Sequence, residues 1–199
     1  MQRNVMLTIA IPTIITREAQ FNALKYEIEA QIKAAKAQDL VEVISECDNK
    51  QISIGKKRDN LIKKAQGKYL VMIDDDDWIG DTYIVDVLNA CQSDPDCIGY
   101  FEDCTFDGGK KAISCISLEY KGWYSNVGNY DYVRSPFFKV PIKTELCKQV
   151  GCTDIRWGED EDFAKRIFPL LKKEYFINKK LYFYRYKYEQ HELKYGFSR

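Results

Sequence analysis

The chain has 199 residues with 30 basic and 30 acidic side chains, so its formal net charge is zero. Because 45% of the residues are hydrophobic, a disordered chain is excluded. The zero net charge argues against binding to nucleic acid or to an anionic membrane by bulk attraction. The length predicts one domain that spans residues 1–199.

The first half of the chain alternates predicted strands and helices. Apolar runs predict buried strands, and apolar residues at every third or fourth position predict amphipathic helices. The strands are expected at residues 5–11, 41–45 and 69–73, and the helices at 21–35, 55–66 and 82–91. Pro12 is expected to end the first strand, and Gly67 to end the second helix. This order predicts an α/β fold, with a parallel sheet in this half and helices on both faces.

The second half is more mixed. Strands are expected at residues 98–101 and 112–118, joined by a turn at residues 107–109. Residues 122–133 are rich in Gly, Asn and Tyr and indicate a loop or a bent strand. The remaining expected elements are helices at 143–150 and 160–171 and an alternating aromatic segment at 181–188.

The cysteines and the apolar runs bear on the cell compartment. The seven cysteines are odd in number and include no C-x-x-C pair, which indicates reduced thiols rather than a disulfide scaffold. No apolar run approaches the roughly 20 residues that span a bilayer. No signal peptide is visible in residues 1–16. We therefore expect a cytoplasmic protein without an integral membrane segment.

Charge alternates along the chain in large blocks, which the zero total conceals. Residues 74–107 contain 11 acidic side chains and no basic one, beginning with Asp-Asp-Asp-Asp at 74–77, the aspartate run. This run directly follows a predicted buried strand, and open α/β sheets bind ligands at the carboxyl ends of their strands. Closely spaced carboxylates suit Mg²⁺ or Mn²⁺, which usually carries substrate phosphates. The alternative is an acidic loop that caps the next helix.

Two further blocks flank this run in the sequence. Residues 49–73 contain 7 basic side chains and 1 acidic one, and Lys57 and Arg58 lie near a predicted helix start that could receive a diphosphate. Residues 159–162 are all acidic and open another predicted helix, where a carboxylate could serve as a general base on a hydroxyl. Solvated helix faces and a favourable macrodipole are the alternatives for these two blocks.

Taken in order, these segments resemble a family 2 glycosyltransferase of the GT-A fold, similar to its small bacterial and viral members. The resemblance covers most of the chain. The matching segments are TIAIPT (8–13), EVISECD (42–48), GKKRDNLIKKAQGKYLVMIDDDDWI (55–79), RSPFFKVPIKTEL (134–146) and WGEDEDFAKRI (157–167). They resemble the opening strand, the nucleotide-contacting second strand, the K-R-N to D-x-D-D pattern, the acceptor side and the E-D helix. Asp59 stands where the family often has Asn.

The resemblance implies a Rossmann-like nucleotide-binding βαβ half at residues 1–107, in a mixed central sheet, and an acceptor half at 108–199. It also implies a metal-dependent, inverting transfer of a sugar from a nucleotide-diphosphate sugar, with a UDP-sugar favoured. The acceptor would be a hydroxyl, such as that of a glycan. The cofactor would be Mn²⁺ or Mg²⁺.

The resemblance also assigns roles to individual residues. The donor-binding residues would be Pro12, Thr13, Asp48, Lys57, Arg58, Asp74 and Asp75. The metal ligands would be Asp76 and Asp74, with the D-x-D register Asp74/Asp76 preferred over Asp75/Asp77, and His191 as a third candidate. Asp160 would be the catalytic base with Glu159 beside it, and Trp157 and Arg134 would bind the acceptor. For His191, an exposed position in a polar tail is an equal alternative.

Two other functions remain open at this point. A nucleotidyltransferase would use the same fold and metal but transfer the nucleotide. A catalytically inactive domain that only binds a nucleotide sugar would conserve the pocket without turnover. A phosphatase with an Asp nucleophile is disfavoured, because Trp78 and Ile79 follow the aspartate run where such enzymes need Gly and then Thr or Val.

Overall fold

A computed structural model describes residues 4–187 and shows a mixed α/β fold around one ten-stranded sheet. The strands are β1 Leu7–Ile14, β2 Val41–Asp48, β3 Tyr69–Met72, β4 Trp78–Ile79, β5 Cys97–Phe106, β6 Lys110–Ile116, β7 Tyr124–Val127, β8 Tyr130–Arg134, β9 Ile142–Lys143 and β10 Glu174–Tyr186. The α-helices are α1 Glu18–Ala34, α2 Ile54–Lys64, α3 Tyr83–Cys91, α4 Thr144–Val150 and α5 Glu159–Ile167. Short 3-10 turns are η1 Ile15–Arg17 and η2 Phe168–Leu170.

The first three strands form the predicted parallel half, with β1 between β2 and β3. The expectation that Pro12 ends the first strand is wrong, because β1 continues to Ile14. β1 pairs with β3 only as far as Ala10, whereas its pairing with β2 continues to Ile14. Pro12 therefore lies where one side of the strand has no partner in β3, and a missing N–H is tolerated at such an edge.

The second half extends the sheet with mixed pairing. β5 pairs antiparallel with β6 and β9 and parallel with β10, and β10 pairs antiparallel with β4. The expected turn between β5 and β6 is confirmed, with Asp107 and Gly108 at φ values of 49° and 72°. Residues 122–133 are neither a loop nor one bent strand, because they fold into the antiparallel hairpin β7–β8.

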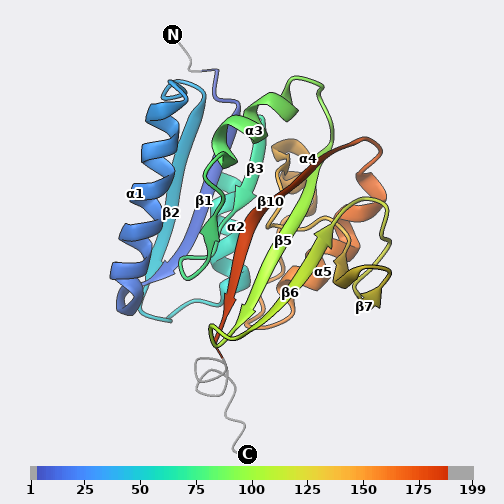
Figure 1. Ribbon diagram of the computed structural model, residues 1–199. Helices are drawn as coiled ribbons and strands as arrows, with labels where there is room; N and C mark the ends of the chain where they lie inside the picture. The colour runs from blue at the N-terminus through green and yellow to red at the C-terminus, as the bar shows by residue number, and fades with distance from the viewer. Residues whose placement is uncertain (1–3, 188–199) are drawn as a thin grey trace, which may run out of the picture.

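The helices cover both faces of the sheet, as expected. α1 contacts α3, while α2 contacts α4 and α4 contacts α5. Figure 1 shows α1 and α3 on one face and α2, α4 and α5 on the other. The buried core runs between these layers, and Leu24 and Ile28 of α1 are among its fully buried residues. Among the described residues, no helix combines the length and apolar character needed to cross a bilayer.

Candidate functional site

The aspartate run follows β3 directly and turns toward two other parts of the chain. Ile73 N–H donates to the carbonyl of Ala10 at 3.0 Å, which holds the start of the run against β1. On the other side, Met72 N–H donates to the carbonyl of Phe138 at 2.8 Å. The run therefore lies at the carboxyl end of β3, between β1 and the segment that leads into β9, as the strand-end argument predicts.

Asp74 is joined to the second acidic block by Arg58. Arg58 Nη2 lies 3.0 Å from Asp74 Oδ1, and its Nε lies 3.6 Å from Glu159 Oε1. The guanidinium also lies over the Phe138 ring, 4.9 Å from its centroid. Burial would lower the pKa of Arg58, but Asp74 and Glu159 raise it above its ordinary value. This one buried cation connects the end of β3 with the start of α5.

Asp75 and Asp76 share a cation that the sequence did not indicate. Arg17 Nη1 lies 2.9 Å from Asp75 Oδ1 and 2.8 Å from Asp76 Oδ2. Asp75 is buried and also accepts the hydroxyl of Thr13 at 2.7 Å. Burial raises the pKa of Asp76, and the neighbouring Asp74 raises it further, while Arg17 acts in the opposite direction.

Asp77 belongs to a buried polar network. It accepts Tyr182 Oη at 2.6 Å and the Arg185 N–H at 3.0 Å, and Lys139 Nζ lies 3.3 Å from it. Lys139 also donates to Glu102 at 2.8 Å. Burial raises the pKa of Asp77 despite the nearby ammonium. Burial would lower the pKa of Lys139, but its two carboxylate neighbours raise it, so this side chain stays an ammonium.

The predicted nucleoside-binding residues gather at the ends of β1 and β2. Lys57 Nζ donates to both Asp48 Oδ1 and the carbonyl of Thr13. Burial would raise the pKa of Asp48, but Lys57 and the Ile52 N–H lower it below its ordinary value. The buried ammonium of Lys57 is thus bonded to the two strand ends, so its contribution is to hold them together.

The first turn of α2 is already engaged within the chain, which revises the expectation of a diphosphate there. Ser53 Oγ accepts the Lys56 N–H at 2.9 Å, and the Gly55 N–H donates to the carbonyl of Ile155 at 3.1 Å. A Cβ at Gly55 would lie 1.9 Å from the carbonyl oxygen of Thr153. Glycine is therefore required for the close approach of the 153–155 segment.

Residues 159 and 160 occupy the first turn of α5, where the helix macrodipole stabilises carboxylates. Glu159 is buried beside Arg58, whereas Asp160 is partly exposed. Burial raises the pKa of Glu159 and Asp160 raises it further, although Arg58 lowers it. Phe163 of α5 stacks on Phe138 with ring centroids 3.9 Å apart, which fixes the helix beside the aspartate run.

The two predicted acceptor residues differ in their surroundings. Trp157 is 70% exposed and precedes Gly158, which has a φ of 79° and begins the turn into α5. Arg134 lies over the rings of Trp123 and Tyr132 and donates to the carbonyl of Tyr124 at 2.9 Å. Burial lowers the pKa of Arg134, while the carboxylates of Glu102 and Asp160 act in the opposite direction. Arg134 therefore experiences the field of the predicted base.

The carboxylate oxygens of the run fit a hard divalent cation in their chemistry. Asp76 is also partly exposed, and its pKa is raised first by burial and then by the neighbouring Asp74 and Asp75, whose charge such a cation would offset. Within residues 4–187, however, no three metal-binding side chains form a cluster. His191, the third predicted ligand, lies outside the described residues.

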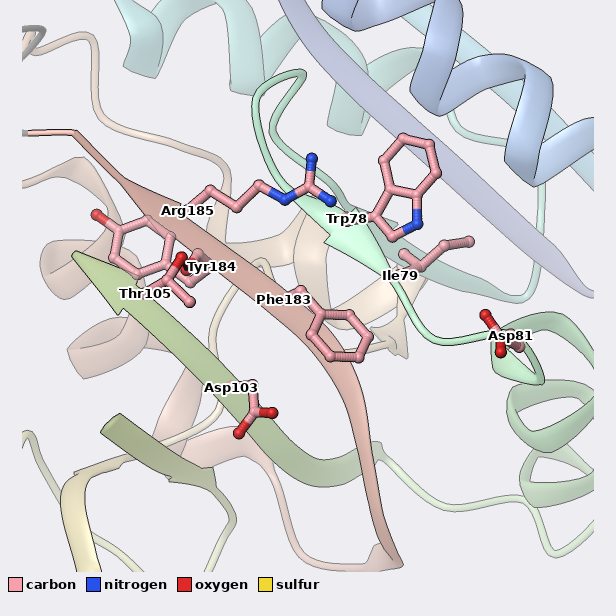
Figure 2. A pocket seen from close by; sticks show the side chains of 8 residues that line it. All are labelled: Trp78, Ile79, Asp81, Asp103, Thr105, Phe183, Tyr184 and Arg185. Atoms are coloured by element: carbon pink, nitrogen blue, oxygen red, sulfur yellow. Dashed lines mark hydrogen bonds between the residues drawn. The ribbon is translucent and has the colours of Figure 1, made fainter. Parts of the chain in front are cut away.

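A separate pocket of about 270 Å³ lies near β4, β5 and β10. Figure 2 shows Trp78, Phe183, Asp103 and Arg185 around it. Because successive side chains of a strand point to opposite faces, Phe183 and Asp103 lie across the sheet from Tyr182 and Glu102. The pocket is also lined by Tyr184, whose ring contacts Lys139, and none of the predicted site residues lines it.

Comparison with known proteins supports the fold. No protein-family model and no curated protein sequence matches the chain. Among solved structures, the chain is similar to S. aureus TarS 1–349, with a TM-score of 0.64 and 16% identity, covering 91% of this chain and 60% of that one. The chain is also similar to TarS 1–349 in complex with UDP-GlcNAc, with a TM-score of 0.61 and 14% identity, covering 91% of this chain and 58% of that one. For TarS 1–349 in complex with UDP, the TM-score is 0.63 and the identity 15%, covering 96% of this chain and 63% of that one.

These similarities show that the chain has a GT-A-like fold, as predicted. The chain spans about three fifths of the TarS 1–349 chains that it matches.

Proposed function

We propose that the protein is a glycosyltransferase that moves a sugar from a nucleotide-diphosphate sugar to an acceptor hydroxyl. The observation that carries this proposal is the contact of Arg58 with both Asp74 and Glu159, which places the end of β3 and the start of α5 at one site. The GT-A-like fold and the binding of UDP-GlcNAc and UDP by the structurally similar TarS support a UDP-sugar as the donor.

The donor nucleoside would lie at the ends of β1 and β2, bordered by Pro12, Thr13 and Asp48. Lys57 holds the last two of these residues in place through its buried ammonium. Lys57 and Arg58 would lie near the diphosphate, and Asp74 and Asp75 would face the ribose and the metal. Asp76, with Asp74, would hold Mn²⁺ or Mg²⁺, which when bound offsets the charge that develops on the leaving diphosphate.

Asp160 is the proposed catalytic base. Its carboxylate is partly exposed in the first turn of α5, so it can reach an acceptor bound next to the donor. It takes the proton of the acceptor hydroxyl while the oxygen attacks the anomeric carbon from the face opposite the diphosphate. The new C–O bond forms as the bond to the diphosphate oxygen breaks, so one displacement inverts the configuration. Glu159 keeps the helix start in position through Arg58.

The acceptor would lie between Trp157 and Arg134. An exposed indole suits stacking on the apolar face of a sugar ring, and a guanidinium suits hydrogen bonds to hydroxyl or anionic oxygens.

The test is an assay of the whole protein with a panel of nucleotide sugars, in which release of the nucleoside diphosphate is measured with Mn²⁺ or Mg²⁺ present. Asp160→Asn should reduce transfer by at least about 100-fold, the lower range for loss of a general base, while UDP binding and thermal stability stay as in the wild type. Glu161→Gln, at an exposed carboxylate of the same helix that pairs with the exposed Lys165, is the matched control. Full transfer by Asp160→Asn would refute its role as the base.

The same assay distinguishes the alternative functions. Release of pyrophosphate would favour a nucleotidyltransferase, and UDP-sugar binding without turnover would favour an inactive domain.

A further inference from the structure

Within residues 4–187, three cationic side chains face the four carboxylates of the aspartate run. Arg58 pairs with Asp74, Lys139 lies beside Asp77, and Arg17 bridges the two carboxylates in between. A divalent cation at Asp76 would therefore approach a carboxylate that already has a positively charged partner. Binding of the divalent cation would therefore require one of these side chains to move away.

The solvent exposure of the three side chains indicates which of them can move away most easily. Arg17 is 27% exposed, whereas Arg58 is 8% and Lys139 is 11% exposed. Arg58 lies over Phe138, and Lys139 lies 3.7 Å from the centroid of the Tyr184 ring. Arg17 is the last residue of the short turn η1 before α1. Of these three, Arg17 can move into solvent with the least rearrangement.

The contact geometry of Arg17 is that of a bridging cation. A single nitrogen, Nη1, lies within 3 Å of one oxygen of Asp75 and one of Asp76, at 2.9 and 2.8 Å. A guanidinium and a divalent cation cannot both occupy this place, because like charges in contact repel strongly. A diphosphate that arrives with the cation would offer the displaced guanidinium new anionic partners.

We propose that Arg17 is a displaceable counter-cation, which pairs with the proposed metal ligand Asp76 in place of the divalent cation and makes cation and nucleotide diphosphate bind together. This inference rests on the proposed function for the identity of the nucleotide. In the absence of nucleotide, Arg17 weakens binding of the divalent cation. With nucleotide bound, the energetic cost of moving Arg17 is offset by its contacts with the diphosphate.

The test measures Mn²⁺ binding by electron paramagnetic resonance, without and with UDP, in the wild type and in Arg17→Met. Lys25→Met is the control, because it removes an exposed positive charge of α1 that pairs only loosely with Glu29, at 3.7 Å. Without UDP, Arg17→Met should bind Mn²⁺ about tenfold more tightly than the wild type, within the roughly 5- to 150-fold range of typical coupling. Lys25→Met should match the wild type. With UDP, the difference should shrink to about threefold or less.

Equal Mn²⁺ affinity of Arg17→Met and the wild type without UDP would overturn the proposal, as would a complete lack of Mn²⁺ binding by both. Arg17→Gln is the second variant. If neither variant folds, the proposal also fails, because a guanidinium that the fold cannot lose is not displaceable. Failure of the wild type to bind UDP would instead refute the proposed function, and the comparison without UDP would still decide the role of Arg17.

Discussion

Replacing Arg58 by Met should destabilise the fold and uncouple the two acidic blocks. Met keeps an aliphatic stem against Phe138 but removes the charge that lies 3.0 Å from Asp74 and 3.6 Å from Glu159. Removing one partner of a buried ion pair costs about 3–5 kcal/mol. Because Asp74 is partly exposed to solvent, we expect the lower value, about 3 kcal/mol.

Thermal unfolding measures this effect. For a protein of this size, about 1 kcal/mol corresponds to roughly 2–4 °C, so Arg58→Met should lower Tm by about 6–12 °C. Arg156→Met removes an exposed arginine and should stay within about 0.5 kcal/mol of the wild type. In the double variant with Asp74→Asn, part of the loss should be recovered, with a coupling of about 1–3 kcal/mol.

The same variant should change the pH dependence of stability. Burial already raises the pKa of Glu159, and loss of Arg58 removes the main opposing charge. A carboxyl whose pKa is higher in the folded state than in the unfolded state costs stability above the unfolded value, and this cost disappears as the group takes up a proton. The deficit of Arg58→Met should therefore shrink as the pH falls from 7 toward 5. A deficit below about 1 kcal/mol at pH 7, or one that grows on acidification, would refute this reasoning.

Two further predictions concern other contacts of the site. Lys139→Met should cost about 3–5 kcal/mol in urea unfolding, because it leaves buried carboxylates without their cation, and adding Glu102→Gln should recover part of the loss. An additive double variant would contradict this pairing. Gly55→Ala should cost about 1–3 kcal/mol, because its Cβ would lie 1.9 Å from the Thr153 carbonyl oxygen. Gly109→Ala should be nearly neutral, because its Cβ would lie 3.7 Å from the Phe106 carbonyl oxygen. Equal Tm values for these two variants would show that the 153–155 segment can move to make room for the Cβ without loss of stability.

Local patterns determined much of the fold. Continuous apolar runs predicted β1 and β3, and the repeat of apolar residues predicted α1 and α2, because burial on a sheet or helix face imposes these patterns on the sequence. β4 and β9 escaped prediction because each has only two residues, too few to show a period. Pro12 was misjudged because its effect depends on how far β3 extends beside β1, which no local pattern records.

The candidate site, like the fold, was predicted only in part from the sequence. The sequence by itself determined the two acidic blocks and their positions at a strand end and a helix start, because these follow from residues that are adjacent in the chain. Only the tertiary structure decided their partners. Arg17 stands 58 residues from Asp75 in the chain, and Lys139 stands 62 residues from Asp77 and 37 from Glu102. Neither cation lies in one of the three charge blocks that the sequence marks. Ion pairs between distant segments depend on the register and packing of the sheet, so they appear only once the chain is folded.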